Sequence, residues 1–151
     1  MKILDATCGY RGIWFNKKQK DTIFIDIRPE VNPDIVMDCT KTTFIDKEFD
    51  LIVFDPPHEG HKKTAKGIFS KSYGNFTAQE IRNLIKNAFI EFHRILKDSG
   101  FILFKWNNHD QKLDKILKLI KDFEPLFGQK VSIRTKHSSA TYWVCFKKIK
   151  E

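Results

Sequence analysis

Four short apolar segments near the start of the chain each end at an acidic residue or run straight into one. Their length and their content of Ile, Leu, Val and Phe are typical of buried strands. We predict strands over residues 2–5, 22–26, 35–37 and 51–54. Helix-like periodicity follows these strands, and alternation between the two periods is the pattern of an α/β domain whose sheet is mainly parallel.

The second half of the chain continues this alternation. Thr77-Ala78-Gln79-Glu80 has the form of a capping box, and apolar residues recur at helical spacing up to Leu96, so we predict a helix that Gly100 closes. Further predicted elements are a short helix around 13–15, a strand over 101–105, a helix over 110–123 that Pro125 stops, and two strands, 130–135 and 141–147, joined as a hairpin through His137-Ser138-Ser139.

The length of 151 residues fits one domain with a single core. No run of about 18 apolar residues that could span a membrane is present, and an acid follows too soon after the start for a signal peptide. We therefore expect a cytoplasmic protein. Cys8, Cys39 and Cys145 are an odd number without metal-type spacing, so we predict reduced thiols, no disulfide and no metal site.

The net charge of +8 is concentrated in one part of the chain. Residues 1–57 contain 8 Lys or Arg and 10 Asp or Glu, whereas residues 58–151 contain 19 and 9. A basic surface attracts nucleic acid by neutralising its phosphates, although a lysine-rich soluble surface would look the same. In the segment 60–76, lysines alternate with aromatic residues, which suits either a nucleic-acid contact or a solvated lid. The candidate contacts are Lys62, Lys63, Lys66, Lys71 and Tyr73.

The acids at the strand ends form a candidate ligand site, because open parallel sheets bind ligands at the carboxyl ends of their strands. Asp26 follows Asp5 by 21 residues, the interval at which a carboxylate after the second strand accepts hydrogen bonds from a ribose. Both acids could equally be solvated strand ends or helix caps. The full Gly-x-Gly-x-x-Gly fingerprint is absent, which favours a nucleoside ligand without phosphates.

The segment Asp55-Pro56-Pro57-His58 directly follows a buried strand. The prolines remove backbone donors and restrict the residue before them, so the Asp55 carboxylate and the Pro56 carbonyl become two fixed acceptors. Two such acceptors can hold an exocyclic amino group of a base and make its nitrogen more nucleophilic, while His58 could stack on the ring. The alternative is a rigid loop that merely ends a strand.

Two motifs carry a resemblance to a known family. Asp5-Ala6-Thr7-Cys8-Gly9-Tyr10 resembles the Asp-Pro-Phe-Cys-Gly-Ser motif, and Asp55-Pro56-Pro57-His58 resembles the Asp-Pro-Pro-Tyr motif, of S-adenosylmethionine-dependent class I amino methyltransferases of the DPPY type. The whole chain is similar to very short phage and mobile-element DNA methyltransferases. Thr7 and Arg11 depart from the first motif, and His58 replaces the usual Tyr or Phe of the second.

The resemblance implies an α/β, Rossmann-like class I methyltransferase fold: a mostly parallel seven-stranded sheet with helices on both faces and a C-terminal antiparallel hairpin. It implies S-adenosyl-L-methionine as cofactor and assigns roles to residues by their place in the motifs. Asp55, Pro56, Pro57 and His58 would be catalytic, and the cofactor would contact Asp5, Ala6, Thr7, Cys8, Gly9, Asp26 and Asp38.

The function that the resemblance implies is methyl transfer to a base amino group, with adenine N6 in DNA favoured. The alternatives are an RNA base methyltransferase and a cofactor-binding protein that binds nucleic acid without catalysis. We expect one minimal domain over 1–151, acting in the cytoplasm of a bacterial or phage-infected cell. Because no separate target-recognition domain is visible, a specificity partner or a homodimer is a possible source of sequence selectivity.

Overall fold

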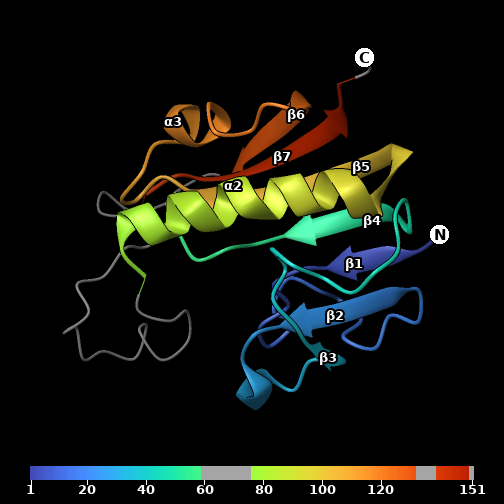
Figure 1. Ribbon diagram of the computed structural model, residues 1–151. Coiled ribbons are helices and arrows are strands. Elements are labelled where there is room, and N and C mark those ends of the chain that lie inside the picture. The colour runs from blue at the N-terminus through green and yellow to red at the C-terminus, as the bar shows by residue number, and fades with distance from the viewer. Residues whose placement is uncertain (59–75, 132–138, 150–151) are drawn as a thin grey trace.

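One mixed sheet organises the computed structural model, which describes residues 1–58, 76–131 and 139–149 (Figure 1). Within these residues the sheet has seven strands in the order β3-β2-β1-β4-β5-β7-β6. The first five pair in parallel, whereas β7 runs antiparallel to both β5 and β6, which confirms the predicted sheet. The strands are β1 (Ile3–Asp5), β2 (Thr22–Asp26), β3 (Ile35–Val36), β4 (Phe49–Phe54), β5 (Leu96–Asn107), β6 (Phe123–Val131) and β7 (Thr141–Lys148).

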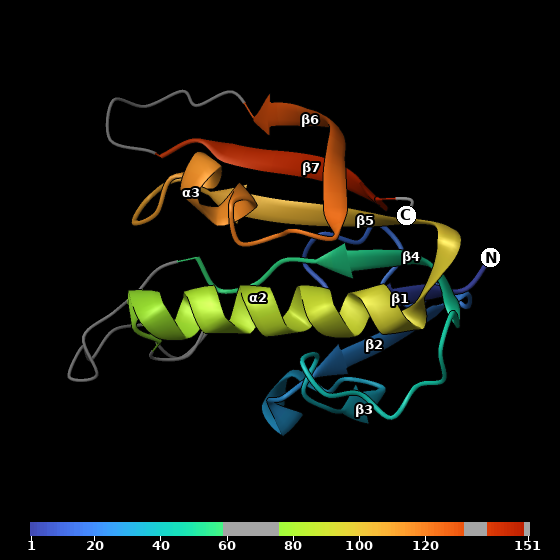
Figure 2. The same ribbon diagram turned by 45° about the horizontal axis from the view of Figure 1, so that its top comes forward.

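The long helix α2 (Ala78–Ile95) covers one face of the sheet (Figure 2). Its predicted capping box is confirmed, since Thr77 Oγ1 accepts the Glu80 N–H at 3.2 Å and Glu80 Oε2 accepts the Thr77 N–H at 2.7 Å. Its buried side chains pack against alternate residues of β4 and β5, with Phe54 and Phe89 in an aromatic cluster. None of the described helices is long and apolar enough to cross a membrane.

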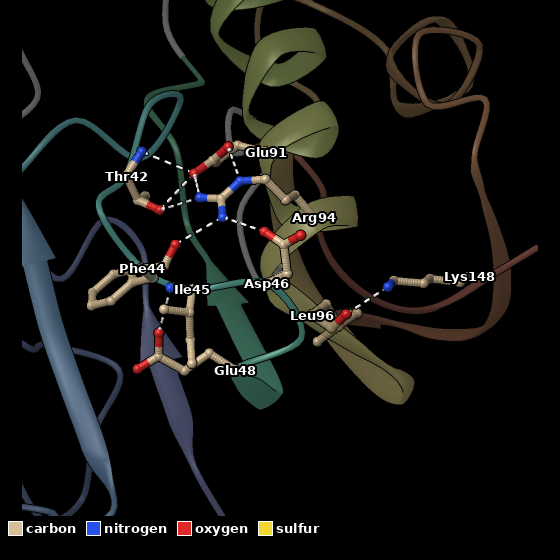
Figure 3. Close-up of polar contacts among 9 residues, drawn as sticks. All are labelled: Thr42, Phe44, Ile45, Asp46, Glu48, Glu91, Arg94, Leu96 and Lys148. Carbon is tan, nitrogen blue, oxygen red and sulfur yellow. Dashed lines mark hydrogen bonds and ion pairs between the residues drawn. The ribbon is translucent and has the colours of Figure 1, made fainter.

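Helix α2 is also joined to the connection between β3 and β4 (Figure 3). Arg94 donates to the Phe44 carbonyl at 2.8 Å and to Asp46 at 2.7 Å, and it forms an ion pair with Glu91 at 2.6 Å. Glu91 in turn accepts from the backbone N–H and the hydroxyl of Thr42. This network fixes the segment that leads into β4, and β4 carries Asp55 at its end.

The predicted helix around 13–15 is wrong, because the chain forms turns there. Gly9 and Arg11 adopt left-handed φ values of 48° and 56°, which interrupt a right-handed helix before it can start. Trp14 instead packs edge-on against Phe24 at 5.2 Å. The described α-helices, α2 and α3 (Leu113–Leu117), contribute to one buried cluster on the face opposite Phe24. Within the described ranges, no α-helix covers the face that carries Phe24, so the prediction of helices on both faces is met on one face only. The remaining helical segment, η1 (Pro29–Val31), is a single turn.

Several predicted boundaries are also wrong. The strand predicted over 101–105 is longer, since β5 begins directly after α2 and spans Leu96–Asn107. The helix predicted over 110–123 shortens to α3, and β6 already begins at Phe123. Pro125 lies inside β6, where it is tolerated because β6 is an edge strand and one side of its backbone needs no donor. Gly100 does not close α2, which ends at Ile95. A Cβ at Gly100 would lie 3.0 Å from the Asp50 carbonyl and 2.6 Å from the Leu96 side chain, so glycine serves close packing there.

Candidate active site

A cavity of about 850 Å³ opens at the carboxyl ends of β1, β2 and β4. The sheet order places β1 between β2 and β4, so the loops that leave these three strands meet at one edge. Most residues predicted to bind cofactor or substrate line this cavity. They are Ala6, Thr7, Cys8, Gly9, Asp26, Asp38, Asp55 and Pro57.

The loop after β1 is held by backbone bonds to both neighbouring strands. Ala6 N–H donates to the Val53 carbonyl and Cys8 N–H to the Ile25 carbonyl, each at 2.9 Å. The positive φ of Gly9 favours glycine, and it points the Gly9 N–H at Asp26 Oδ2, 3.0 Å away. Burial raises the pKa of the Cys8 thiol to about 12, which removes it as a thiolate nucleophile.

Asp5 is outside the cavity lining and is only 1% exposed. Its carboxylate accepts the Trp14 indole N–H at 2.6 Å and the Thr7 N–H at 3.2 Å. Burial raises its pKa to about 7, and the charges of Asp55 and Asp26 add to this increase. The described contacts of Asp5 therefore orient the loop.

Asp26 faces the cavity in a tight pair with Arg28, a residue that the sequence analysis did not single out. Asp26 Oδ1 accepts the Arg28 backbone N–H at 3.0 Å and its Nε at 2.9 Å, while Oδ2 accepts Arg28 Nη2 at 3.0 Å. Burial by itself would raise the pKa of Asp26, but the hydrogen bonds from Arg28 and Gly9 outweigh it and lower the pKa. The spacing of two residues after Asp26 is a signal that could have drawn attention to Arg28.

Asp38, after β3, organises the next loop. Its Oδ1 accepts both the backbone N–H and the hydroxyl of Thr40 at 2.8 Å. Thr40 and the buried Cys39 also line the cavity. Burial raises the pKa of Cys39, so this thiol too is protonated at neutral pH.

Asp55 forms an ion pair that sequence reasoning missed. Lys105, from β5, donates to Asp55 Oδ2 at 2.7 Å and lies 6.0 Å from the centre of the Trp143 ring. The Asp55 backbone N–H donates to Thr7 Oγ1 at 3.0 Å, which ties the loop after β4 to the loop after β1. Asp55 is thus fixed at both its backbone and its side chain.

The remaining residues of the second motif lie around Asp55. Pro56 is buried and His58 is half-buried, and neither residue lines the cavity. The His58 ring lies edge-on to Trp106 with 6.4 Å between centroids. Trp106 is fully buried and donates to the Gln111 carbonyl, so it belongs to the core.

Helix α2 supplies a wall of the cavity that the sequence analysis did not identify. Phe76 and the helix residues Glu80, Asn83, Leu84 and Asn87 line it. Polar residues at 80, 83 and 87 recur at helical spacing on one stripe, which was the available signal.

The candidate nucleic-acid contacts Lys62, Lys63, Lys66, Lys71 and Tyr73 lie outside the described residues, as does most of the predicted hairpin turn. Among the residues that are described, no group of three or more His, Cys, Asp or Glu could hold a metal ion.

The fold is that of S-adenosylmethionine-dependent methyltransferases, as solved structures show. A TehB-like enzyme of this class from Corynebacterium glutamicum superposes with a TM-score of 0.63 and 18% identity, over 98% of this chain and 80% of that one. A SAM-dependent methyltransferase from Methanosarcina mazei gives 0.66 and 15%, over 99% and 93%.

The third comparison is the 1,6-didemethyltoxoflavin-N1-methyltransferase of Burkholderia thailandensis, solved with its substrate and S-adenosylhomocysteine. It gives a TM-score of 0.62 and 12% identity, over 98% of this chain and 71% of that one. The sequence matches no protein-family model and no curated protein. At these identities the comparisons show the Rossmann-like methyltransferase fold alone.

Proposed function

We propose that this protein is an S-adenosylmethionine-dependent methyltransferase that modifies an exocyclic amino group of a nucleic acid base, with adenine N6 in DNA as the favoured target. The observation that carries the proposal is that residues of both motifs line one cavity. The Thr7 hydroxyl accepts the Asp55 N–H, so the loop assigned to the cofactor and the loop assigned to the amino group are in direct contact.

The residues present fit a nucleoside-bearing cofactor. A volume of about 850 Å³ lies within the range of small-molecule sites, and the lining combines apolar side chains with a few oriented polar groups. In this assignment the cofactor would be held by Ala6, Thr7, Cys8, Gly9, Asp26 and Asp38. Asp5 would position the loop through its hydrogen bonds from Thr7 and Trp14. The cofactor, when bound, supplies an electrophilic methyl group on a sulfonium.

The chain's own residues would orient the amino group. In the proposal, Asp55 Oδ1 and the Pro56 carbonyl each accept one N–H of the amino group, which restrains the nitrogen and raises its nucleophilicity. Lys105 donates to Oδ2, and this bond fixes the orientation of the carboxylate and therefore the position of Oδ1. His58 supplies a ring on which the base can stack. A base in a duplex would have to leave its stack to reach these groups.

The charge distribution supports a nucleic acid over a neutral metabolite. The 19 Lys or Arg against 9 Asp or Glu in residues 58–151 would attract phosphates. RNA remains the alternative polymer, and binding without catalysis is the alternative activity. We propose that one domain carries the activity, and that sequence selectivity is low or comes from a partner or a second copy of the chain.

Labelled methyl transfer to unmethylated DNA and to RNA, followed by mass analysis of the nucleosides, tests the proposal. We expect N6-methyladenine from DNA. A methylated RNA base would favour the RNA alternative, and cofactor binding without product on either polymer would favour the non-catalytic one.

The matched variants are Asp55→Ala and Asp50→Ala, which remove the acceptor oxygens. Each acid pairs with a lysine of β5: Asp50 bonds Lys97 at 2.8 Å, and Asp55 bonds Lys105 at 2.7 Å. Only Asp55 lines the cavity. We expect Asp55→Ala to reduce transfer by about a hundredfold or more with cofactor affinity retained, and Asp50→Ala to leave transfer nearly unchanged. Full activity of Asp55→Ala would refute the assigned chemistry.

A further inference from the structure

Lys105 and Asp55 form an ion pair in the wall of the cavity. Lys105 Nζ donates to Asp55 Oδ2 at 2.7 Å, and both residues line the cavity. The Lys105 side chain is 25% exposed and that of Asp55 is 16% exposed, so most of the pair is shielded from water. A ligand that reaches Asp55 from the cavity therefore meets the Lys105 ammonium as well.

The Lys105 ammonium keeps donors that Asp55 does not use. An ammonium has three N–H donors and no acceptor. In the part of the chain that the structure describes, Asp55 is the only hydrogen-bond acceptor of Lys105. Trp143, directly opposite Lys105 on β7, adds a cation–π contact with its ring centre 6.0 Å from Nζ. The pair thus offers a ligand one acceptor, Asp55 Oδ1, beside a donor, Lys105 Nζ.

An acceptor beside a donor complements the Watson–Crick edge of adenine, where the amino group at N6 donates and the ring nitrogen N1 accepts. When adenine leaves a duplex, both atoms lose their partners on the opposite strand, and enzymes that flip bases replace these bonds with their own. Cytosine presents the same arrangement at N4 and N3. Guanine has an N–H at N1 beside its amino group, and this donor would face the donors of Lys105.

We propose that Lys105 recognises the ring nitrogen next to the target amino group, which in adenine is N1, by donating a hydrogen bond to it. Asp55 Oδ1 then accepts the amino N–H on the N1 side, and the Pro56 carbonyl accepts the other N–H. Lys105 in this way selects a base that carries an amino group beside an acceptor nitrogen, which admits adenine and cytosine and disfavours the Watson–Crick edge of guanine. The inference rests on the proposed function, because it requires that Asp55 binds a base amino group.

Methylation of deaza analogues tests this contact. The adenine that the wild-type enzyme methylates is replaced by 1-deazaadenine, which lacks the N1 acceptor, or by 7-deazaadenine, which lacks the acceptor on the other side of the amino group. Each base is placed opposite an abasic site, so that differences in base pairing do not contribute. We expect the wild-type kcat/KM to fall about tenfold or more for 1-deazaadenine and to stay within about twofold for 7-deazaadenine. Equal effects of the two analogues would overturn the inference.

Lys105→Met separates the contact from the intrinsic reactivity of the analogue. Methionine keeps an unbranched side chain without an N–H, so we expect this variant to methylate adenine more slowly and to lose most of the preference for adenine over 1-deazaadenine. Weaker support of Asp55 slows both substrates alike, and the ratio of their kcat/KM values isolates the ring nitrogen. Lys105→Arg keeps N–H donors and should retain part of the preference. A preference that persists undiminished in Lys105→Met would overturn the inference and leave the role of Asp55 intact.

Lys97→Met is the matched control. Lys97 also pairs from β5 with an acid of β4, since it donates to Asp50 at 2.8 Å, but neither residue lines the cavity. We expect this variant to keep the full preference for adenine over 1-deazaadenine. If the wild-type enzyme methylates no adenine, the proposed function and the inference are refuted together. Formation of N6-methyladenine without discrimination between the two analogues refutes the inference alone.

Discussion

Asp5 is the least exposed acid in the described part of the chain, and its ionisation opposes folding. In the unfolded chain its pKa is near 3.8, whereas burial raises the folded value to about 7. Between these values the folded state binds a proton that the unfolded state does not. The contribution of Asp5 to stability is therefore complete below about pH 4 and is lost as the pH rises to about 7.

We predict that Asp5→Asn removes this pH dependence. Relative to wild type, the variant should gain unfolding free energy as the pH rises from 4 to 7, by up to about 4 kcal/mol, because asparagine has no charge to desolvate. Urea unfolding across this range measures the difference. A constant offset is expected, since an amide cannot accept from both Trp14 and Thr7 as the carboxylate does. Parallel curves for the two proteins would contradict the prediction.

The residues that line the site were predictable where a motif fixed their backbone, but their partners were not. Asp55 is at the expected strand end, yet its bond to Lys105 depends on the register of β4 with β5, which pairs residues fifty positions apart. The orientation of the Asp5 side chain was not predictable either, because it depends on the hydrogen bond from the Trp14 indole, nine residues later. Arg28 is nearer in sequence, and its position two residues after Asp26 was the available signal for this ion pair, although the pair has no periodic signature.

At the scale of elements, the first turn of α2 combines a stability role with a site role. Thr77 caps the helix, and Glu80, its reciprocal partner, also lines the cavity. We predict that Thr77→Ala lowers the unfolding free energy by about 1 kcal/mol and also weakens cofactor binding, because the turn that carries Glu80 and Asn83 frays. Urea unfolding and calorimetry measure the two effects.

Thr77→Ser is the matched control for this prediction. Serine keeps the hydroxyl that accepts the Glu80 N–H, so both stability and affinity should stay close to wild type. Loss of stability without any change in affinity would separate the helix cap from the cavity and contradict the coupling.

Elements with a strong local signal were predicted well. The capping box and the apolar stripe of α2 fixed that helix, and the runs before Asp26 and Asp55 fixed their strands. The chain from 110 to 131 was misread because β6 is an edge strand whose side chains, apart from Phe123, are exposed, so it shows no alternation of apolar and polar residues. Pro125, which indicates a helix stop in the sequence, belongs to that strand.

At the scale of the whole molecule, the uneven charge predicts how nucleic acid binding responds to salt. Log affinity for DNA should fall linearly with log salt concentration, by about 0.7 to 0.9 for each phosphate neutralised. We predict that replacing the lysines of the segment 60–76 with alanine makes this slope shallower and weakens binding, with cofactor affinity unchanged. The replaced residues are Lys62, Lys63, Lys66 and Lys71.

The matched control replaces four exposed lysines of the acidic first part of the chain: Lys17, Lys18, Lys20 and Lys41. The change in net charge is the same, so a purely global effect would alter both slopes equally. Equal slopes in fluorescence anisotropy would show that the basic segment has no special role.

The overall architecture was predictable because alternating periodicity indicates a mainly parallel sheet, while the order of the seven strands was implied by the resemblance carried by two motifs. The helix content was less so, since turns at Gly9 and Arg11 replace a helix that the apolar residues had indicated. Sequence alone also could not choose among methyl acceptors, because this choice depends on side chains beyond the two motifs.

The central position of β1 bears on how the molecule is assembled. Ile3 is flanked by Thr22 on one side and Leu51 on the other, so a strand of three residues cannot settle before much later parts of the chain have formed. Long loops must close first, at an entropic cost that local contacts do not offset. The part of the sheet that borders the cavity should therefore form late in folding, when β1 pairs with both β2 and β4.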